Sequence, residues 1–407
     1  MRVENEETTS KSIVKYDYTR FPKFFSEFKR SEYWKSMEAT VEDSPWHREK
    51  NVAVHTEMSL EQAERWFKPD ASDRHKLLTK LAILFHDTGK PPMEVEKTSE
   101  ERGVYRSYAN HEQRSARIFE GFMFDNWAEM KDWIDMVDVY TVAWIIEHHL
   151  PYGLKNQNKI DALVKSLVGL PRNEDIAIFF NSLLGDAHGR TSDNYTENTK
   201  NVVEWVEDMT ARVLAMPANT IRREDFKGEV LMLVGPPGVG KSTVRDHLIK
   251  TQKQLFEYSL DDDRLMYAAM MHPQEYDALP TEAARYQFAF RVATDEEKAF
   301  GIFTEANLKK VFERGNQGLI VIDNTNVSIK QRRKYIELAN QNKMYHWAIY
   351  FPSSMKFLLE RNEKRGDKKL PHGALQNLFH AVAMPSAYGE LHNVAMFTES
   401  MDNAAKG

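Results

Sequence analysis

The residues most directly tied to a chemical task form an eight-residue run that begins at Gly235. The run reads Gly-Pro-Pro-Gly-Val-Gly-Lys-Ser and fits the pattern G-x-x-x-x-G-K-[ST]. The apolar residues 229–234 before it predict a buried strand, and residues 243–250 after it predict a helix. In that context glycines let backbone N–H groups surround phosphates, Lys241 reaches the β and γ oxygens, and Ser242 contacts Mg²⁺. We therefore expect ATP or another nucleoside triphosphate, with Mg²⁺, to bind at Gly235, Pro236, Pro237, Gly238, Val239, Gly240, Lys241, Ser242 and Thr243.

Histidine and aspartate recur at the ends of predicted helices in the first half of the chain. A helix with Leu77, Leu81 and Phe85 on one face ends in the pair His86-Asp87. Two strongly polar groups at the end of an apolar helix need a reason, whereas a lone histidine is more often structural. In the interior of a helical bundle, imidazoles and carboxylates would bind Mn, Fe, Ni, Co or Zn, and one carboxylate could bridge two ions. The candidate ligands are His55, His86, Asp87, His111, His148 and Asp186, with His149 as the alternative to His148.

Two bridged metal ions lower the pKa of a bound water and so make hydroxide available for phosphoester hydrolysis. Lys90 and Arg190 lie within four residues of a predicted ligand. Each is therefore either a phosphate clamp or a solvated surface charge. We favour His148 as the ligand because His149 shares a helix face with apolar residues. The remaining histidines of this half are interpreted as structural or surface residues: His47, His75 and His188.

Charged residues also follow the predicted strands of the second half. Asp261 and Arg264 come after a strand predicted at 254–260. At the carboxyl end of a parallel strand, an aspartate can accept a proton from an attacking hydroxyl and an arginine can hold an anion. An acidic turn is the alternative. Asp323 follows the next strand as a second carboxylate, and the basic run that begins at Arg361 suits either a lid over a triphosphate or a solvated helix face.

The first half resembles the HD phosphohydrolase superfamily. The resemblance lies in the order H…HD…H…H…D and in the run Leu84-Phe-His-Asp-Thr-Gly-Lys90. It implies that Asp87 bridges two metal ions. It implies that the ligands of one ion are His55, His86, Asp87 and Asp186. His111 and His148 would complete the site of the second ion.

The second half resembles the 5′-OH polynucleotide kinase family, through its P-loop, a D-x-x-R motif, a T-N pair and R-x-x-x-R-G. The resemblance implies that Asp261 is the general base and that Arg264 grips a phosphate of the acceptor strand. In this chain Asn324 separates the acidic residue from the T-N pair. We therefore give the acidic role to Asp323. The other residues implied are Thr325 and Asn326 near the acceptor or Mg²⁺, and Lys241, Arg361 and Arg365 on the donor phosphates.

Together the halves resemble the HD-domain/polynucleotide-kinase enzymes that heal broken RNA and DNA ends, over residues 45–400. The resemblance implies removal of a 2′-, 3′- or 2′,3′-cyclic phosphate by the HD half and phosphorylation of the 5′-OH by the kinase half. The chain has no K-x-D-G motif, so we expect a separate nucleic-acid ligase to seal the RNA or DNA ends. The alternatives are an HD nucleotidase fused to a nucleoside or nucleotide kinase, and a nucleotide-sensing regulatory protein.

The predicted helices and strands that position these residues fall into two domains, as expected for a chain of 407 residues. Helical periodicity predicts an all-α HD-type bundle over 1–215, and residues 216–228 are polar and aperiodic, as in a linker. Alternating strands and helices over 229–407 predict an α/β P-loop kinase with a parallel sheet. Its four predicted strands are 230–234, 254–260, 318–322 and 346–351.

The composition sets broad limits on the class of protein. Hydrophobic residues make up 42% and charged residues 29%, which is typical of a globular chain. Cysteine is absent, which excludes disulfides and thiolate metal sites. No run of eighteen apolar residues is present and the first residues lack a secretory segment, so we expect a cytoplasmic protein without membrane contact. An aromatic, basic stretch within residues 1–30 is expected to pack onto the domain, with nucleic-acid stacking as the alternative.

Overall fold

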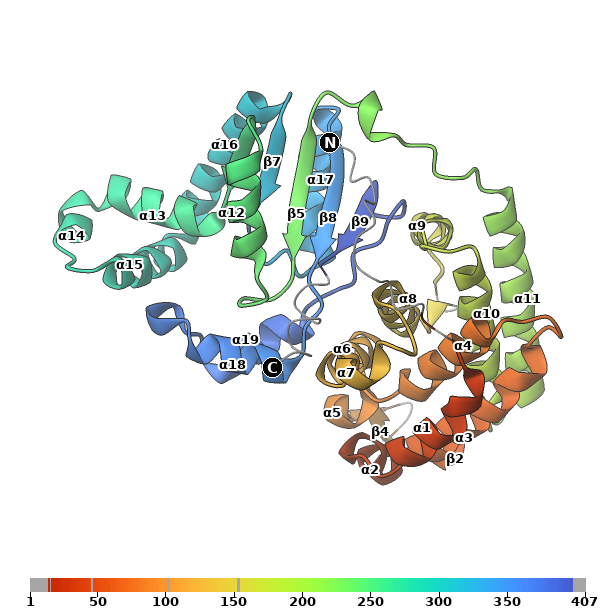
Figure 1. Cartoon of the computed structure of the whole chain (residues 1–407). Coiled ribbons are helices and arrows are strands. Elements are labelled where there is room, and N and C mark those ends of the chain that lie inside the picture. The colour runs from red at the N-terminus through yellow and green to blue at the C-terminus, as the bar shows by residue number, and fades with distance from the viewer. Residues whose placement is uncertain (1–13, 15, 45–46, 101–102, 152–153, 398–407) are drawn as a thin grey trace.

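The computed structural model describes residues 14, 16–44, 47–100, 103–151 and 154–397. The first residues of the chain, on which the prediction about a secretory segment depends, lie outside these ranges. Figure 1 shows a helical half, drawn from red to yellow-green, beside a half built on a sheet, drawn from green to blue. The helices of the first half are α1 (Phe21–Phe28), α2 (Glu32–Ala39), α3 (Val52–Ala63), α4 (Asp73–Phe85), α5 (Lys90–Met93), α6 (His111–Asp125), α7 (Trp127–Met130), α8 (Met136–Glu147), α9 (Gln157–Val168), α10 (Glu174–His188) and α11 (Tyr195–Ala215).

Helix α4 is the centre of the helical half. The Ser72 side chain caps its first turn by accepting a hydrogen bond from the His75 backbone N–H at 3.0 Å. Nearly all of its side chains are buried, and α3, α8 and α10 pack around it. The helix ends at Phe85, which places His86 and Asp87 at its buried C-terminal end. The neighbouring helices therefore decide which side chains reach that point.

The aromatic stretch near the N-terminus packs onto this core. Phe21 and Phe28 are buried, and the rings of Phe28 and Phe85 lie 4.8 Å apart. Phe24 makes an edge contact with Trp133 at 5.1 Å between ring centroids. Within the described residues, the packing interpretation of this stretch is therefore supported over nucleic-acid stacking.

Two small antiparallel hairpins interrupt the helical half and were not predicted from the sequence. They pair β1 (Val41–Ser44) with β2 (His47–Asn51), and β3 (Val95–Ser99) with β4 (Gly103–Ser107). Strands β3 and β4 are mostly exposed on both faces, so they lack the polar–apolar alternation that identifies a strand in sequence. The half remains a helical bundle with these hairpins at its edge.

The second half contains the predicted parallel sheet. Its strands are β5 (Glu229–Val234), β6 (Leu255–Tyr258), β7 (Leu319–Ile322), β8 (Tyr345–Tyr350) and β9 (Asn393–Met396). They lie in the order β6-β7-β5-β8-β9, and every neighbouring pair is parallel. The four predicted strands are confirmed, whereas β9 is a short, partly exposed edge strand that the sequence analysis missed.

Eight helices accompany the sheet within the described residues. The connections from the strands to these helices contain the residues that follow each strand. Figure 1 shows α13, α14 and α15 projecting from the sheet as an arm. The helices are α12 (Lys241–Thr251), α13 (Leu260–Met271), α14 (Pro273–Asp277), α15 (Glu282–Asp295), α16 (Glu297–Gly315), α17 (Ile329–Gln341), α18 (Met355–Glu363) and α19 (His372–His380).

The two halves share a buried interface. One hydrophobic cluster extends from α4 and α8 to β5 and β8. Within it, Arg117 of α6 donates hydrogen bonds to Glu120 and to the hydroxyl of Tyr350 at the end of β8. Between the halves, residues 216–228 contain only one short 3-10 helix, Arg223–Asp225. The halves are therefore joined by packing as well as by this connection.

Candidate functional sites

Asp87 lies at the centre of the histidine cluster in the helical half. Its oxygens are 3.2 Å from His86 Nε2, 3.2 Å from His111 Nε2 and 3.7 Å from His149 Nε2. His55 Nε2 lies 3.6 Å from Asp87 and 3.0 Å from Asp186 Oδ1. The structure therefore brings together side chains from α3, α6 and α10 and from the ends of α4 and α8.

The four imidazoles of this cluster share one orientation. Each places Nδ1 against a backbone carbonyl and directs Nε2 toward the carboxylates. An Nδ1–H that donates to a carbonyl leaves Nε2 with a free lone pair, which is the form that binds a metal ion. The four Nδ1–carbonyl pairs are His55–Gly189 at 3.3 Å, His86–Ile83 at 2.6 Å, His111–Tyr108 at 2.8 Å and His149–Ile146 at 2.8 Å.

Gly89 allows α6 to approach the end of α4. A Cβ at this position would lie 2.3 Å from the backbone oxygen of His111, closer than real Cβ contacts permit. The Gly89 N–H donates to Ser115 Oγ at 2.8 Å, which fixes the same contact. The start of α6, and with it the His111 side chain, can therefore reach Asp87.

The structure places His149, not His148, in the cluster. The His148 ring stacks on Trp144 with centroids 4.1 Å apart, and its Nδ1 faces the Trp144 carbonyl. The helical-face argument for His148 is wrong because α8 ends at Glu147, so helical periodicity no longer orients the two residues after it. His149 is 3% exposed and faces Asp87.

The charges around Asp87 balance one another in the buried cluster. Burial raises the pKa of Asp87, but the charges of His86 and Lys90 outweigh this effect and hold that pKa well below its usual range. Burial lowers the pKa of His86, whereas Asp87 and Asp186 raise it above its ordinary value. Burial, followed by the charges of His86 and His111, lowers the pKa of His149 to about 3. The carboxylates are thus ionised and His149 is neutral at pH 7.

Lys90 and Arg190 both contact predicted ligands. Lys90 Nζ lies 2.7 Å from Asp87 Oδ2 and also pairs with Glu42. Because Lys90 is only 5% exposed, it is not a solvated surface charge. Arg190 Nη2 lies 2.5 Å from Asp186 Oδ2 and remains partly exposed. Both cations therefore lie beside carboxylates of the cluster.

The residues present fit the divalent ions predicted for this site. Two groups of ligand atoms share Asp87, and the atoms of each group all lie within 4.8 Å of one another. One group contains His55 and His86, and the other contains His111 and His149. Both Asp87 oxygens and His111 Nε2 are buried without a hydrogen bond of normal geometry. Buried polar atoms left in this state are costly unless a ligand satisfies them. The donor set of imidazoles and carboxylates suits Mn, Fe, Co, Ni or Zn.

The P-loop connects β5 to α12 in the second half. Gly238 and Gly240 have φ values of 93° and 105°, a conformation that L side chains rarely adopt. Lys241 Nζ donates to the backbone oxygens of Gly235 and Pro236 at 2.8 and 2.9 Å, so it lies across the loop. The loop and the N-terminus of α12 therefore have the arrangement that surrounds phosphates.

Three further charged groups act on Lys241. Burial lowers its pKa to about 8, and smaller effects come from Asp323, Arg365 and Asp261, in that order. The predicted base, the second carboxylate and a lid arginine therefore share the electrostatic neighbourhood of Lys241. Lys241 itself is 9% exposed.

Asp261 and Arg264 lie one turn apart on α13. Arg264 Nη1 is 2.5 Å from Asp261 Oδ1, and the Tyr286 hydroxyl donates to Asp261 Oδ2 at 3.0 Å. Tyr286 lies on α15 and was missed by the sequence analysis, because no motif marks a tyrosine on a separate helix. The Arg264 guanidinium also lies 5.1 Å from the Phe290 ring centroid. Asp261 is thus oriented by two neighbours and half exposed.

The residues after β7 divide into two roles. Asp323 Oδ2 accepts a hydrogen bond from Arg245 Nη1 at 2.7 Å and faces the P-loop side. Thr325 accepts the Gly235 backbone N–H through its carbonyl at 3.0 Å. Asn326 is 1% exposed, and its amide donates to the Leu233 carbonyl. Asn326 therefore holds the backbone beside the P-loop, and its place next to the acceptor or Mg²⁺ stays a prediction.

The two lid arginines differ in environment. Arg361 lies on α18 beside the P-loop, because a Cβ built at Gly238 would lie 3.8 Å from the Cβ of Arg361. Its guanidinium lies 5.3 Å from the Phe357 ring centroid, and the residue is exposed. Arg365 is half-buried with Nη1 lacking a hydrogen bond, and burial lowers its pKa. Arg361 thus lies beside the P-loop, and the charge of Arg365 acts on Lys241.

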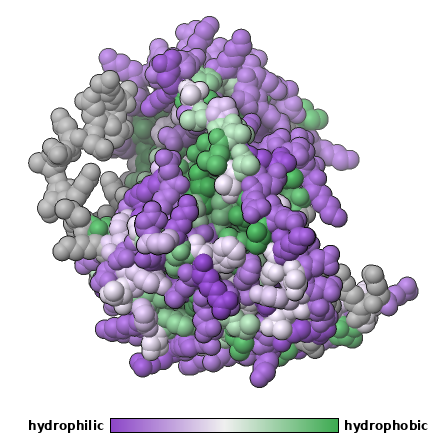
Figure 2. All heavy atoms as spheres, turned by 90° about the vertical axis from the view of Figure 1, so that its right-hand side faces the viewer, coloured by the Kyte–Doolittle hydropathy of each residue, from purple (hydrophilic) through white to green (hydrophobic). Residues whose placement is uncertain are grey.

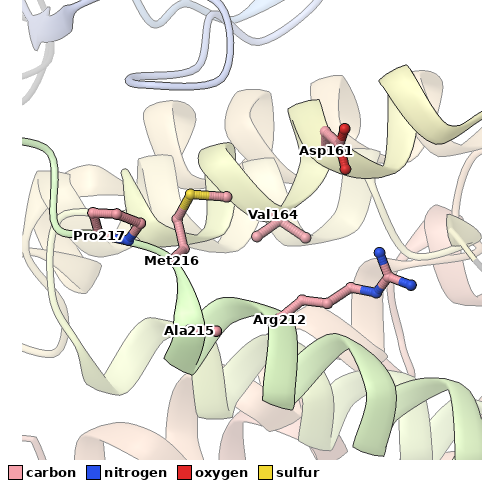
Figure 3. Close-up of a pocket in the computed structure, with 6 residues that line it drawn as sticks. All are labelled: Asp161, Val164, Arg212, Ala215, Met216 and Pro217. Carbon is pink, nitrogen blue, oxygen red and sulfur yellow. The ribbon is translucent and has the colours of Figure 1, made fainter.

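A separate hollow occupies another face of the molecule. Figure 2 shows hydrophobic atoms gathered in a hollow on the face that forms the right-hand side of Figure 1. A pocket of about 310 Å³ lies between α9, α11 and the chain that follows α11. The close-up in Figure 3 shows the residues that line it. None of the six lining residues is a predicted site residue: Asp161, Val164, Arg212, Ala215, Met216 and Pro217.

Comparisons with known families agree with this geometry. Residues 52–168 match the model of the HD domain, and residues 230–382 match a model described as AAA domain. The chain joins an HD domain to an AAA-type P-loop domain. The two matches support an enzyme with phosphohydrolase and kinase activity. No curated protein matches the chain, and no helix within the described ranges is long and apolar enough to cross a membrane.

Three solved structures are similar to parts of the chain. Two are described as the Pnkp1/Rnl/Hen1 RNA repair complex and the Pnkp1/Rnl/Hen1 complex, with 20% and 23% identity and TM-scores of 0.29 and 0.24. The matches cover 41% and 35% of this chain and 47% and 40% of those chains, so this chain spans less than half of their length. The third, the crystal structure of APE1195, has 20% identity and a TM-score of 0.25 over 44% of this chain and 91% of that chain.

Proposed function

We propose that this chain heals broken nucleic-acid ends. The HD domain removes a 2′-, 3′- or 2′,3′-cyclic phosphate from the 3′ end, and the P-loop domain phosphorylates the 5′-OH with ATP or another nucleoside triphosphate. The observation that supports this most strongly is that both sets of charged residues are assembled in one chain. Asp87 is shared by two groups of metal-ligand atoms, and Asp261 acts on the buried Lys241 of the P-loop.

In the HD domain, the proposed ligands are His55, His86, Asp87 and Asp186 for one divalent ion and Asp87, His111 and His149 for a second. Divalent ions in such a site lower the pKa of water so that hydroxide is available for attack on phosphorus. Lys90 and Arg190 would exchange part of their contact with Asp87 and Asp186 for the oxygens of the scissile phosphate. The backbone carbonyls that hold each Nδ1 keep the imidazoles directed inward during this exchange.

In the P-loop domain, Lys241 and the loop N–H groups hold the β and γ phosphates, and Ser242 contacts Mg²⁺. Asp261 accepts the proton of the 5′-OH. For this to happen, Arg264 must move its guanidinium from Asp261 toward a phosphate of the acceptor strand. Tyr286 remains as a donor that orients the carboxylate. Arg361 and Arg365 close over the donor phosphates from the side of α18.

The pairing of activities suits breaks made by internal attack in RNA, which leave a cyclic phosphate and a 5′-OH. A separate ligase would then join the healed ends, because the chain lacks the K-x-D-G motif. Two of the similar solved structures are described as Pnkp1/Rnl/Hen1 complexes, and one of these descriptions names RNA repair. We include DNA ends in the proposal because the residues that would grip a phosphate do not distinguish the two sugars.

The test is incubation of the full chain with a 5′-OH, 3′-phosphate RNA oligomer, ATP and a panel of divalent metals. We expect a 5′-phosphate in the presence of Mg²⁺ and release of inorganic phosphate in the presence of a transition metal. A matched reaction with nucleoside 3′-phosphate in place of the oligomer measures the small-molecule alternative. If only the mononucleotide reacts, the chain is a nucleotide enzyme and the end-healing proposal is wrong.

A further inference from the structure

The β1–β2 hairpin carries polar side chains that neither proposed site uses. Glu42 lies on β1, and His47 and Glu49 lie on β2. His47 Nδ1 is 3.6 Å from Glu42 Oε2 and 3.4 Å from Glu49 Oε2. Both glutamates are 4% exposed although carboxylates are almost never buried without a partner. His47 was interpreted from the sequence as a structural or surface residue, and the hairpin that carries it was not predicted.

Each glutamate is held by one oxygen only. Glu42 Oε1 pairs with Lys90 Nζ, and Glu49 Oε1 accepts the backbone N–H of Thr191 at 2.7 Å. The second oxygen of each, Oε2, is buried without a hydrogen bond, and so is Nδ1 of His47. His47 Nδ1 therefore lies within 3.6 Å of two buried carboxylate oxygens, and none of the three atoms has a hydrogen bond. Such an arrangement is unfavourable unless a cation or a proton occupies the space.

His47 Nδ1 faces one oxygen of each glutamate and has no hydrogen-bond partner. One imidazole and two carboxylates form a donor set for a divalent ion of the Mn, Fe, Co or Zn type.

We propose that Glu42, His47 and Glu49 bind a further divalent metal ion, separate from the ions grouped around Asp87. Its ligands are Glu42 Oε2, His47 Nδ1 and Glu49 Oε2, and water completes its coordination. The site adjoins the Asp87 cluster through His55, whose ring lies 4.9 Å from that of His47 and whose Nδ1 is 3.7 Å from Glu49 Oε1. The structure thus assigns the hairpin a third metal position beside the two-ion centre.

Metal counting tests this inference independently of activity. The metal-free full chain is titrated with Mn²⁺, bound ions are counted by electron paramagnetic resonance and equilibrium dialysis, and Co²⁺ absorption reports imidazole ligation. The variant Glu49→Gln keeps an oxygen acceptor for Thr191 and removes the charge. The variant His47→Ala removes the nitrogen ligand. We expect each variant to bind one ion fewer per chain than the wild type, with the remaining affinities unchanged.

Asp186→Asn is the matched control, because it alters the Asp87 cluster and leaves the hairpin intact. It should lose an ion that both hairpin variants retain, which shows that the two losses are separate. Equal ion counts in wild type and Glu49→Gln would overturn the hairpin site, since a proton on Glu49 would then account for the geometry. If the wild type binds no ion at all, the hairpin site and the proposed HD chemistry both fail. If only Asp186→Asn loses an ion, the hairpin site alone fails.

Discussion

At the scale of single residues, the chemistry depends on how side chains are held before a substrate arrives. In the four imidazoles of the Asp87 cluster, Nδ1 contacts a backbone carbonyl, so each ring is held with Nε2 toward the carboxylates. Asp261 is held by Arg264 and Tyr286. Lys241 is held by two carbonyls of its own loop. Each of these groups therefore has its orientation set before a substrate binds.

The burial of Lys241 predicts a pH dependence of nucleotide binding. Its pKa in the free protein is lowered to about 8, whereas a bound triphosphate stabilises the charged ammonium and raises that pKa. Below pH 8 the lysine is already protonated, so the Kd for nucleotide should be nearly constant. Above pH 8 binding must take up a proton, and the Kd should rise by up to about tenfold per pH unit. Calorimetric titrations with ATP between pH 7 and 9.5 measure this slope. Lys241→Ala should bind weakly with a flat profile, and an equally flat wild-type profile would contradict the prediction.

The proposed role of Arg264 predicts different behaviour with a polymer acceptor and with a nucleoside. Replacing Arg264 with alanine removes the proposed contact to a phosphate of the acceptor strand. The loss in kcat/KM for a 5′-OH oligonucleotide should correspond to about 1.5–3 kcal/mol, the range for a charged hydrogen bond. The Kd for ATP should change little, because Lys241 and the loop hold the donor. Lys241→Ala should instead reduce activity with all acceptors.

Arg291→Ala is the control for Arg264→Ala, since Arg291 is an exposed arginine on the same arm. Its kcat/KM should match that of the wild type. An unchanged oligonucleotide reaction in Arg264→Ala would contradict the proposed role of Arg264. A larger loss with the free nucleoside than with the oligomer would do so as well.

At the scale of elements, the site depends on where helices and strands end. The strands β5, β6 and β7 were predicted from apolar runs, and the residues that follow them include the P-loop, Asp261 and Asp323. Parallel pairing alone brings these ends together, so this part of the site could be predicted from sequence. The choice between His148 and His149 could not be predicted, because it depends on whether α8 includes residue 149 or ends at Glu147.

Contacts between distant segments were also beyond the sequence. Lys90 is buried and pairs with Glu42, which lies 48 positions away on a hairpin that was not predicted. Asn326 sits in a left-handed turn with φ 49° and is buried. Its T-N motif is equally compatible with an exposed ligand-binding side chain. Such roles are set by tertiary packing, which motif and spacing do not encode.

Asn326 should therefore matter for stability more than for chemistry. Its amide donates to the carbonyls of Leu233 and Ile322 at 3.0 and 3.1 Å. Asn326→Ala removes these hydrogen bonds. The alanine must still adopt the left-handed backbone conformation, now without them. We expect a loss of about 2–3 kcal/mol in the free energy of unfolding, measured by urea denaturation. Asn342→Ala, at a partly exposed helix end, should cost less than about 0.5 kcal/mol. Equal effects of the two substitutions would contradict the structural role of Asn326.

At the scale of the whole molecule, a buried polar network joins the two domains. Arg117 and Glu120 of α6 meet the Tyr350 hydroxyl from β8, and Glu120 also accepts the Ser353 N–H at 3.0 Å. Burial raises the pKa of Glu120 although Arg117 opposes this effect. Because these groups are removed from water, they tolerate little change in their geometry. The domains should therefore unfold together.

Arg117→Ala tests this coupling. It leaves Glu120 buried without its cation, so we expect a loss of about 3–5 kcal/mol in the free energy of unfolding at pH 7. Part of the loss should be recovered at acid pH, because protonation neutralises a glutamate whose pKa is raised by burial. Calorimetric melting at pH 7 and pH 5 measures both effects. Arg212→Ala, which breaks an exposed pair with Asp208, should cost no more than about 1 kcal/mol. A small, pH-independent effect of Arg117→Ala would contradict the coupling.

The central claim is that two independent sites in one chain act on opposite nucleic-acid ends. The most direct measurement follows both ends of one RNA oligomer, with a 5′-OH and a 2′,3′-cyclic phosphate, in the Asp87→Ala variant with ATP, Mg²⁺ and Mn²⁺. Asp87 is shared by both groups of metal-ligand atoms in the HD domain, and the P-loop residues are on another domain. The account predicts that the 3′ end stays blocked while the 5′ end is phosphorylated at nearly the wild-type rate. Loss of both activities in folded Asp87→Ala protein, or retention of 3′ processing, would contradict it.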